Sequence, residues 1–327
     1  MAFANKFGWS VTRESMFDLC KRRYFYHYYL SWGGWNQSAP QPVREAFKLK
    51  RLTSLSLWRG QLVHYIASKV LQSMRKKGRI PDRDDVVKYT LERFEQQYSF
   101  SRAGRYLVEP KKRGDRLNID WLALFEHEYG LEPDGRILDN TRNECIEAVE
   151  GLLSSPILEA IGETDPSGWF IEDLDHAEFS QSFEFENVTV YAKTDFMYIG
   201  GDGRFNIVDW KTYRKPRMPD GSSGEGRGMN VQLGVYGYYA YEVLEKELDS
   251  IRLYEVNLLD EARAAEHGID GEGIESTRMH ISEGISKLAD LLRNRDTSSN
   301  EPLPMEHFPK ISGGLCKHCN FRRICRD

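Results

Sequence analysis

Two carboxylates and a lysine interrupt the apolar pattern of the segment Tyr191–Tyr213. Alternating apolar residues from Val188 onward, glycines in the middle and a second apolar run predict a β-hairpin. Residues two apart on a strand share a face, so Asp209 and Lys211 are expected to point the same way. Together with Asp195, they could hold a hard divalent cation and orient or activate a water. An Asp–Lys ion pair at a strand end fits the same residues, so the hairpin alone leaves both interpretations open.

Further candidate side chains lie upstream of this hairpin. Glu178 and Glu184 could each supply another carboxylate. His64 follows Gly60 by four residues, which places both on one face of a predicted helix. A lone histidine on a helix is more often structural than a ligand. The position of His64 therefore allows a metal ligand or a structural residue.

Three cysteines near the end of the chain, Cys316, Cys319 and Cys325, follow the spacing C-x2-C-x5-C. Three thiolates spaced in this way indicate a metal site that needs a fourth ligand. Cys20 is one candidate, because neighbouring cationic residues would lower the pKa of its thiol, and His318, between the two closest cysteines, is a less suitable one. The spacing does not separate a zinc site from an iron–sulfur cluster, and unligated cysteines are a third interpretation. Cys145, in a predicted helix, is expected to be a small buried hydrophobic residue.

The elements that must position these residues make the chain an α/β protein. Gln232 and Tyr236 lie one turn apart on a predicted tyrosine-rich helix. The run Lys21–Tyr29 is rich in basic and aromatic residues, and it suits either an aromatic core segment or a groove for a single nucleic-acid strand. Residues 31–42 read as a loop, and the polar loop at 219–228 lacks a phosphate-binding fingerprint. Periodicity predicts helices over 55–74, 82–98, 120–129, 140–153, 230–248 and 274–295, and strands over 179–185 and 251–258.

Composition limits the class of protein. The 327 residues are 40% hydrophobic and 29% charged, as in a globular protein. The net charge of -5 means that a polyanionic partner would need a local basic patch. No secretory signal and no membrane-spanning run is visible, so we expect an intracellular protein without a membrane partner. Disulfides are then a poor explanation for five cysteines.

The motifs, taken in order, resemble the RecB-like branch of the PD-(D/E)XK nucleases. The cysteine arrangement resembles its iron–sulfur subgroup, which includes CRISPR-associated exonucleases and the nuclease domains of AddB-type helicase–nucleases. The resemblance covers essentially the full chain, from Ser10 to Cys325. The motifs that carry it are Gly60-x3-His64, Asp195, Asp209-Trp210-Lys211 and Gln232-x3-Tyr236, with Cys20 and the C-terminal cysteines.

The resemblance implies a fold and an organisation. The fold is a restriction-endonuclease-like α/β core, a mixed central β-sheet flanked by helices with the hairpin at its centre. The whole chain, 1–327, would be one nuclease domain. It would comprise a mainly helical part (1–165), a nuclease core (166–300) and a C-terminal cysteine segment (301–327) that closes on Cys20.

The resemblance also implies roles for single residues. His64, Asp195 and Asp209 would ligate Mg²⁺ or Mn²⁺, with the Trp210 carbonyl as a further ligand. Lys211 would position or activate the attacking water. Gln232 and Tyr236 would contact the substrate and order the site. Cys20, Cys316, Cys319 and Cys325 would ligate a 4Fe–4S cluster, with zinc as the alternative.

The implied activity is that of a metal-dependent deoxyribonuclease, an exonuclease on single-stranded DNA ends in repair, recombination or defence. Its partners would be DNA with a free end and a helicase or other subunit of a nuclease complex. Two alternatives remain at this stage. One is a catalytically idle DNA-binding or assembly subunit with the same fold, and the other is a zinc-stabilised RNA-processing protein.

Overall fold

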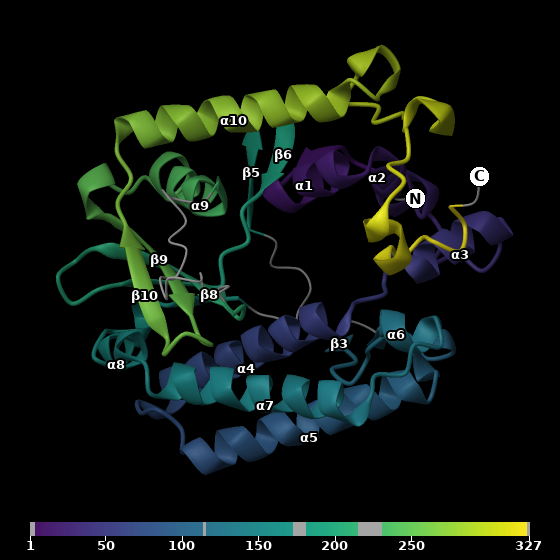
Figure 1. The fold of residues 1–327 in the computed structure, drawn as a ribbon. Helices are drawn as coiled ribbons and strands as arrows, with labels where there is room; N and C mark the ends of the chain where they lie inside the picture. The colour runs from purple at the N-terminus through teal and green to yellow at the C-terminus, as the bar shows by residue number, and fades with distance from the viewer. Residues whose placement is uncertain (1–3, 114–115, 173–180, 215–230, 326–327) are drawn as a thin grey trace, which may run out of the picture. The chain divides into compact units, whose positions relative to one another are not determined.

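The computed structural model describes residues 4–113, 116–172, 181–214 and 231–325, which are coloured in Figure 1. The chain forms two compact units that alternate along the sequence. We call Met1–Thr53, Ser182–Ala192 and Ser276–Asp327 the terminal unit, and Ser54–Gln181 with Lys193–Glu275 the central unit. The organisation as one nuclease domain remains a prediction.

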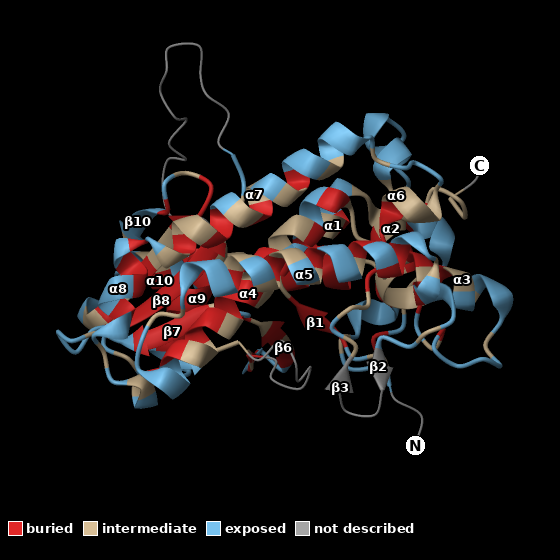
Figure 2. Ribbon diagram, turned by 90° about the horizontal axis from the view of Figure 1, so that it is seen from below, coloured by how far each residue is buried: buried red, intermediate tan, exposed pale blue. Residues whose placement is uncertain are grey.

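A five-stranded mixed sheet forms the centre of the central unit. Its strand order is β10-β9-β8-β7-β4. Strand β8 pairs antiparallel with β7 and parallel with β9, so it lies inside the sheet with a neighbour on each side. Six of its seven residues are buried, and Figure 2 shows β7 and β8 almost entirely in the colour of buried residues. The strands are β4 (Phe170–Ile171), β7 (Phe196–Ile199), β8 (Phe205–Lys211), β9 (Ile251–Asn257) and β10 (Arg263–His267).

The central hairpin differs from the prediction in its first strand. That strand is Phe196–Ile199, and the strand Val188–Tyr191 (β6) instead pairs with other segments in the terminal unit. The prediction was wrong because β6 buries one face and alternates, BiBi, whereas β7 buries three consecutive residues and shows no alternation. The turn is as expected from its glycines: Gly203 has φ +80°, and the Gly200 N–H donates to the Arg204 carbonyl at 2.8 Å.

Helices pack against this sheet and form the main hydrophobic core. Ser54, Asp82 and Asp134 cap the long helices α4, α5 and α7 by accepting backbone N–H bonds. The core joins buried residues of these helices to β7, β8 and β9. The helices are α4 (Leu55–Lys77), α5 (Arg83–Arg102), α6 (Phe125–Glu128), α7 (Gly135–Leu153), α8 (Pro156–Gly162) and α9 (Val231–Glu242). Shorter elements are the pair β2 (Lys112–Arg113) and β3 (Arg116–Leu117), and 3-10 turns at Arg105–Leu107, Pro166–Gly168 and Leu248–Ser250.

The predicted helices are present, with shifted ends. The segment 120–129 is helical only over Phe125–Glu128. The helix predicted over 230–248 ends early, at Glu242. There the Tyr239 carbonyl accepts hydrogen bonds from the N–H groups of both Val243 and Leu244, and Glu245 takes a left-handed conformation. In the described residues no helix is long and apolar enough to cross a membrane.

The terminal unit has a small sheet of its own, in the order β1-β6-β5. Helix α10, which belongs to this unit from Ser276 onward, packs closely against the N-terminal segment. A Cβ on Gly284 would lie 2.3 Å from Trp9 Nε1 and 2.6 Å from Glu14 Oε2, so only glycine fits. The elements are β1 (Gly8–Trp9), α1 (Val11–Leu19), α2 (Lys21–Phe25), a π-helix (Tyr26–Leu30), α3 (Gln41–Leu49), β5 (Ser182–Phe185), β6 and α10 (Gly271–Ala289), with 3-10 turns at Arg293–Arg295, Met305–His307 and Gly314–His318.

The aromatic run Lys21–Tyr29 is a core segment. Tyr24 and Tyr26 are buried, and the ring of Tyr26 lies 5.5 Å from that of Phe321 near the C-terminus. Arg22 Nε donates to the Phe308 carbonyl at 2.8 Å. The core interpretation of this run is therefore the one that holds, and it joins the two ends of the chain. The loop expected over 31–42 continues only to Pro40, and helix α3 begins at Gln41, although no helix was predicted there.

Candidate active site

Strand β8 places Asp209 and Lys211 on one face of the sheet, at the C-terminal end of the strand. Asp209 is 2% exposed, and its strand lies inside the sheet between β7 and β9. Lys211 Nζ lies 2.5 Å from Asp209 Oδ2. The shared face follows from the two-residue period of a strand, as the sequence predicts. The Asp–Lys ion pair that was the plainer interpretation is thus present, and the surrounding residues show what else the pair can do.

Asp195 is held at the start of β7 by two different elements. Its Oδ1 lies 2.9 Å from His64 Nδ1 on α4, and its Oδ2 accepts the Trp210 N–H of β8 at 2.8 Å. The indole of Trp210 is buried in the core, so the residue acts here through its backbone amide. The carboxylate of Asp195 is therefore fixed next to Asp209 before any ligand arrives. His64 orients Asp195, and ligation by His64 or by the Trp210 carbonyl remains a prediction.

Helix α9 completes the site with a chain of hydrogen bonds. Lys211 Nζ donates to Gln232 Oε1 at 3.1 Å, and Gln232 Nε2 donates to the Tyr236 hydroxyl at 2.5 Å. The Tyr236 hydroxyl in turn donates to the Lys193 carbonyl, two residues before Asp195. The Lys211 ammonium can only donate, so it must face the amide oxygen of Gln232. The Lys193 carbonyl can only accept, so the Tyr236 hydroxyl donates to it and accepts from the Gln232 NH2 group, which leaves the amide one orientation. Gln232 and Tyr236 were expected to contact the substrate and to order the site; these hydrogen bonds position Lys211, and contact with a substrate remains a prediction.

Charge in the site favours a bound cation. Burial, and after it the negative charge of Asp195, raise the pKa of Asp209 to about 6 against the opposing effect of Lys211. Burial would lower the pKa of His64, but the charge of Asp195 and its hydrogen bond outweigh burial, so the pKa is raised. Asp209 Oδ2 is buried and, despite the short distance to Lys211 Nζ, has no hydrogen bond of acceptable geometry among the described residues. A buried carboxylate that repels its neighbour and has an unsatisfied oxygen is a natural ligand for a divalent ion.

The metal-ligand set is incomplete in the described part of the chain. There, no group of three or more His, Cys, Asp or Glu side chains is arranged to hold a metal ion. Asp195 and Asp209 are the oxygen donors that suit Mg²⁺ or Mn²⁺. The residues present therefore fit such an ion in donor chemistry, with two protein carboxylates as its basis.

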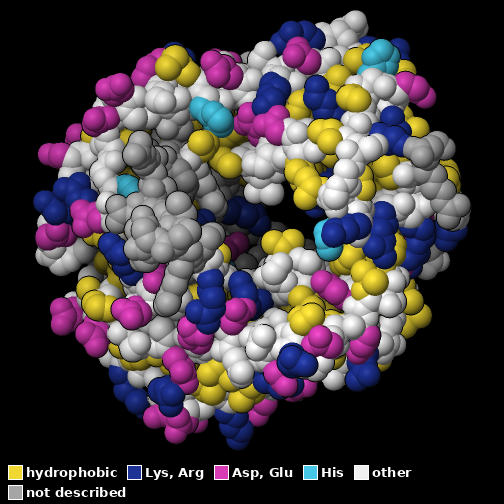
Figure 3. All heavy atoms as spheres, in the orientation of Figure 1, with side chains coloured by type: hydrophobic (Ala, Val, Ile, Leu, Met, Phe, Trp, Pro, Cys, Tyr) yellow, Lys and Arg dark blue, Asp and Glu magenta, His cyan; other side chains and the backbone are white. Residues whose placement is uncertain are grey.

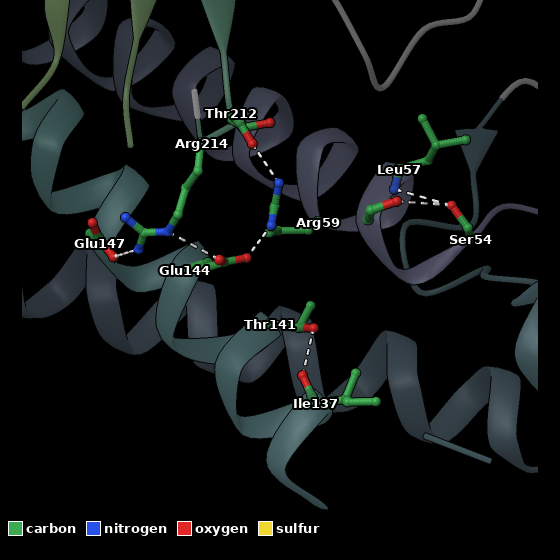
Figure 4. Close-up of polar contacts among 10 residues, drawn as sticks. Ser54, Leu57, Arg59, Ile137, Thr141, Glu144, Glu147, Thr212 and Arg214 are labelled. Carbon is green, nitrogen blue, oxygen red and sulfur yellow. Dashed lines mark hydrogen bonds and ion pairs between the residues drawn. The ribbon is translucent and has the colours of Figure 1, made fainter. Parts of the chain in front are cut away.

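A network next to the site was not expected from the sequence. Arg59 Nη2 donates to the Thr212 carbonyl at 2.5 Å, directly after β8, and Arg59 pairs with Glu144 of α7. Glu144 also pairs with Arg214, and Figure 4 shows the three side chains and Thr212 converging. Gly60 allows this approach, since a Cβ there would lie 3.1 Å from Thr212 Oγ1. Helix α4 thus holds both strands of the hairpin. The available signal was that Arg59 precedes the glycine of the Gly60-x3-His64 motif.

Glu172 is a second residue that the sequence did not single out. Its N–H donates to the Asp195 carbonyl at 3.3 Å, and its own carbonyl accepts from Ser68 Oγ of α4 at 2.8 Å. Burial and the charge of Asp195 raise the pKa of its carboxyl. Of the two glutamates proposed earlier, Glu178 lies outside the described residues, and Glu184 belongs to β5 of the terminal unit, where it accepts a hydrogen bond from Thr189.

Cysteines from the two ends of the chain lie near one another in the terminal unit, but no three of those described are arranged to hold a metal ion. Burial raises the pKa of Cys319, and the nearby thiols of Cys20 and Cys325 raise it further. Cys316 is exposed, and its thiol donates to the Ile311 carbonyl at 3.2 Å. Cys145 is buried in α7 with a pKa raised to about 12, which confirms its prediction as an inert core residue. The structure therefore brings three of the four predicted ligands into one neighbourhood, and the cluster itself remains a prediction.

Comparison with known proteins adds one finding. A family model described as the PD-(D/E)XK nuclease superfamily matches residues 8–326, almost the whole chain. No curated protein matches the chain.

Proposed function

Because the chain belongs to the PD-(D/E)XK nuclease superfamily, we propose that it is a Mg²⁺- or Mn²⁺-dependent deoxyribonuclease that acts at Asp195, Asp209 and Lys211. The observation that carries the proposal is the buried Asp209 carboxylate, unsatisfied at Oδ2 and placed between a second aspartate and a lysine. If Asp209 and Lys211 formed only a structural ion pair, the nearby carboxylate of Asp195 would have no use, since its charge raises the pKa of Asp209 and so weakens the pair.

The roles of the chain's own residues follow from their contacts. Asp195 and Asp209 would hold the divalent ion, which when bound neutralises phosphate charge and makes a water more nucleophilic. Lys211 lies between Asp209 and Gln232, so its ammonium is fixed where it can donate a hydrogen bond to the attacking water or to the phosphate. His64 fixes the orientation of the Asp195 carboxylate.

The finer description rests on the motif order and on the cysteines. We propose that the substrate is single-stranded DNA with a free end, in repair, recombination or defence, with a helicase or other nuclease subunit as partner. We also propose a 4Fe–4S cluster at Cys20, Cys316, Cys319 and Cys325. Supporting it is the shared neighbourhood of Cys20, Cys319 and Cys325, which are far apart in the sequence. Zinc at the same residues is the alternative.

The test is cleavage of end-labelled DNA and RNA, single- and double-stranded, by protein purified without oxygen, in Mg²⁺, Mn²⁺ or EDTA. Asp209→Asn should abolish cleavage. Asp202→Asn is the matched control, because Asp202 is an exposed aspartate in the turn of the same hairpin. Equal cleavage by Asp209→Asn and the wild type would refute the site. A wild type that binds DNA but cleaves nothing with either metal would favour the idle subunit, and cleavage of RNA alone would favour RNA processing.

A further inference from the structure

Two tryptophans of the terminal unit are exposed side by side. Trp32 is 36% exposed and Trp35 is 48% exposed, and their rings meet edge to face with centroids 5.0 Å apart. By contrast, Trp9, Trp58 and Trp210 are at most 1% exposed. A large aromatic ring at the surface gives up burial that would stabilise the fold. An adjacent exposed pair therefore indicates a surface that binds something.

The loop that carries the pair is tightly fixed. Ser31 is buried and its hydroxyl donates to the His27 carbonyl at 2.6 Å. A Cβ on Gly34 would lie 2.3 Å from Phe47 Cβ and 2.6 Å from the Val43 carbonyl, so the loop touches helix α3 where only glycine fits. The ring of Trp35 lies 6.0 Å from that of Phe47. The aromatic surface is thus held in place before a ligand binds, which lowers the entropy cost of binding.

Two cations lie against Phe47, the ring next to Trp35. Lys50 Nζ and the Arg51 guanidinium lie 5.6 and 5.3 Å from the centroid of the Phe47 ring. Burial lowers the pKa of Lys50, and the positive charges of Arg13 and Arg51 lower it further. These groups therefore repel one another, and an anion would relieve the repulsion.

Two cations at this surface, Lys50 and Arg13, have no carboxylate partner among the described residues. Within the described segments, neither Lys50 nor Arg13 forms an ion pair with a carboxylate; their contacts there are aromatic rings and, for Arg13, the Gly8 carbonyl. Figure 3 shows Lys and Arg side chains gathered among hydrophobic ones over α3 and the C-terminal segment. A local basic patch of this kind is what a polyanion needs on a chain whose net charge is -5.

We propose that Trp32, Trp35, Phe47, Lys50 and Arg51 form a binding surface for single-stranded nucleic acid. Bases stack on the two indoles, and the phosphates of the same strand lie against Lys50 and Arg51. This combination of stacking rings and cations is the one that holds single strands without sequence preference. An apolar protein partner would not need the cations, and a double helix would not offer free base faces. The inference rests on the proposed function only in taking a nucleic acid as the ligand.

The test measures binding of fluorescent oligo(dT) in EDTA by anisotropy, in the Asp209→Asn background so that the strand stays intact. Trp32→Ala/Trp35→Ala should weaken binding about tenfold or more, with an unchanged salt dependence. Lys50→Gln/Arg51→Gln should also weaken binding and reduce the slope of log K against log salt by about 1.4, as for two lost phosphate contacts on a single strand.

Matched variants show that the effects belong to this surface. Lys76→Gln/Lys77→Gln removes the same charge from exposed residues at the end of α4 and should leave both affinity and salt slope unchanged. Trp35→Phe keeps a ring and should retain most of the affinity that Trp35→Ala loses. Unchanged melting temperatures show that the variants are folded. Because Trp32 and Trp35 are the exposed indoles, oligo(dT) should also quench the intrinsic fluorescence, and less so in Trp35→Phe.

Two results would overturn the inference. One is equal oligo(dT) affinity of Trp32→Ala/Trp35→Ala and the background protein. The other is equal loss of affinity in the Lys76→Gln/Lys77→Gln control. A second assay separates failure of this inference from failure of the proposed function. It measures cleavage of a dinucleotide by Trp32→Ala/Trp35→Ala with Asp209 intact, because so short a substrate reports on hydrolysis and not on binding of a long strand. Loss of dinucleotide cleavage in Asp209→Asn supports the hydrolytic site whatever the tryptophans do.

Discussion

Replacement of Gln232 by methionine isolates the role of the hydrogen-bond chain. Gln232 Oε1 accepts from Lys211 Nζ at 3.1 Å, and Gln232 Nε2 donates to the Tyr236 hydroxyl at 2.5 Å. Methionine has a similar length and no hydrogen-bonding amide. The variant therefore leaves Lys211 with Asp209 as its one described anchor and leaves the carboxylates themselves unchanged.

The size of the effect follows from the kind of bond removed. A hydrogen bond to a charged group contributes about 1.5–3 kcal/mol. If that free energy serves to hold the ammonium of Lys211 in the transition state, its loss lowers kcat about ten- to hundredfold. The affinity for Mg²⁺ should stay the same, because Gln232 is not among the proposed metal ligands. Asp209→Asn, in contrast, should change the metal titration itself.

The assay is a Mg²⁺ titration of single-turnover cleavage on an end-labelled single strand. Gln61→Met is the control, since Gln61 is an exposed glutamine on α4 of the same unit. The expected result is a lower maximal rate with an unchanged midpoint for Gln232→Met, and wild-type behaviour for Gln61→Met. Thermal unfolding checks that the core is intact.

Two outcomes would refute this reasoning. A Gln232→Met variant that cleaves as fast as the wild type would mean that the chain from Lys211 to Tyr236 is structural only. A shifted Mg²⁺ midpoint with an unchanged maximal rate would mean that Gln232 acts on metal binding, directly or through Asp209.

Three further predictions concern the rest of the molecule. Cys20→Ser and Cys319→Ser should cause similar losses of iron and of thermal stability, whereas Cys145→Ala should lose no iron and only a little stability; one zinc and no iron in anaerobically purified wild type would contradict the cluster. Burial and neighbouring cations lower the pKa of His27 in the folded protein to about 3, so the folded state holds this histidine neutral. The stability that neutral His27 contributes is complete above pH 6.5 and is lost as the pH falls below 6.5, because the unfolded state then binds a proton that the folded state does not. Between pH 6.5 and 5 the free energy of unfolding should fall by up to about 2 kcal/mol, and His27→Gln should flatten this dependence in denaturant melts; parallel curves would contradict it. Arg59→Ala should reduce the cleavage rate more than Arg59→Lys does, because alanine cannot replace the hydrogen bond to the Thr212 carbonyl that holds the end of β8. Equal cleavage rates in the wild type, Arg59→Ala and Arg59→Lys would contradict this prediction.

Local pattern was enough for the residues that carry the chemistry. The two-residue period of β8 put Asp209 and Lys211 on one face, and the ion pair between them is present. The helical spacing of Gln232 and Tyr236 likewise agrees with their direct hydrogen bond. These relations lie within one element, so its geometry determines them and no partner is needed. The order of the motifs likewise predicted the superfamily that the family model matches.

Only the tertiary structure decided which segments are partners. The choice of Phe196–Ile199 over Val188–Tyr191 as the partner of β8, the bond from Arg59 to the Thr212 carbonyl, and the packing of Tyr26 against Phe321 all depend on contacts between distant segments. An alternation of apolar residues indicates that a strand buries one face, but it does not indicate which element packs against that face. Which face is covered, and by which element, is a property of the whole packed chain.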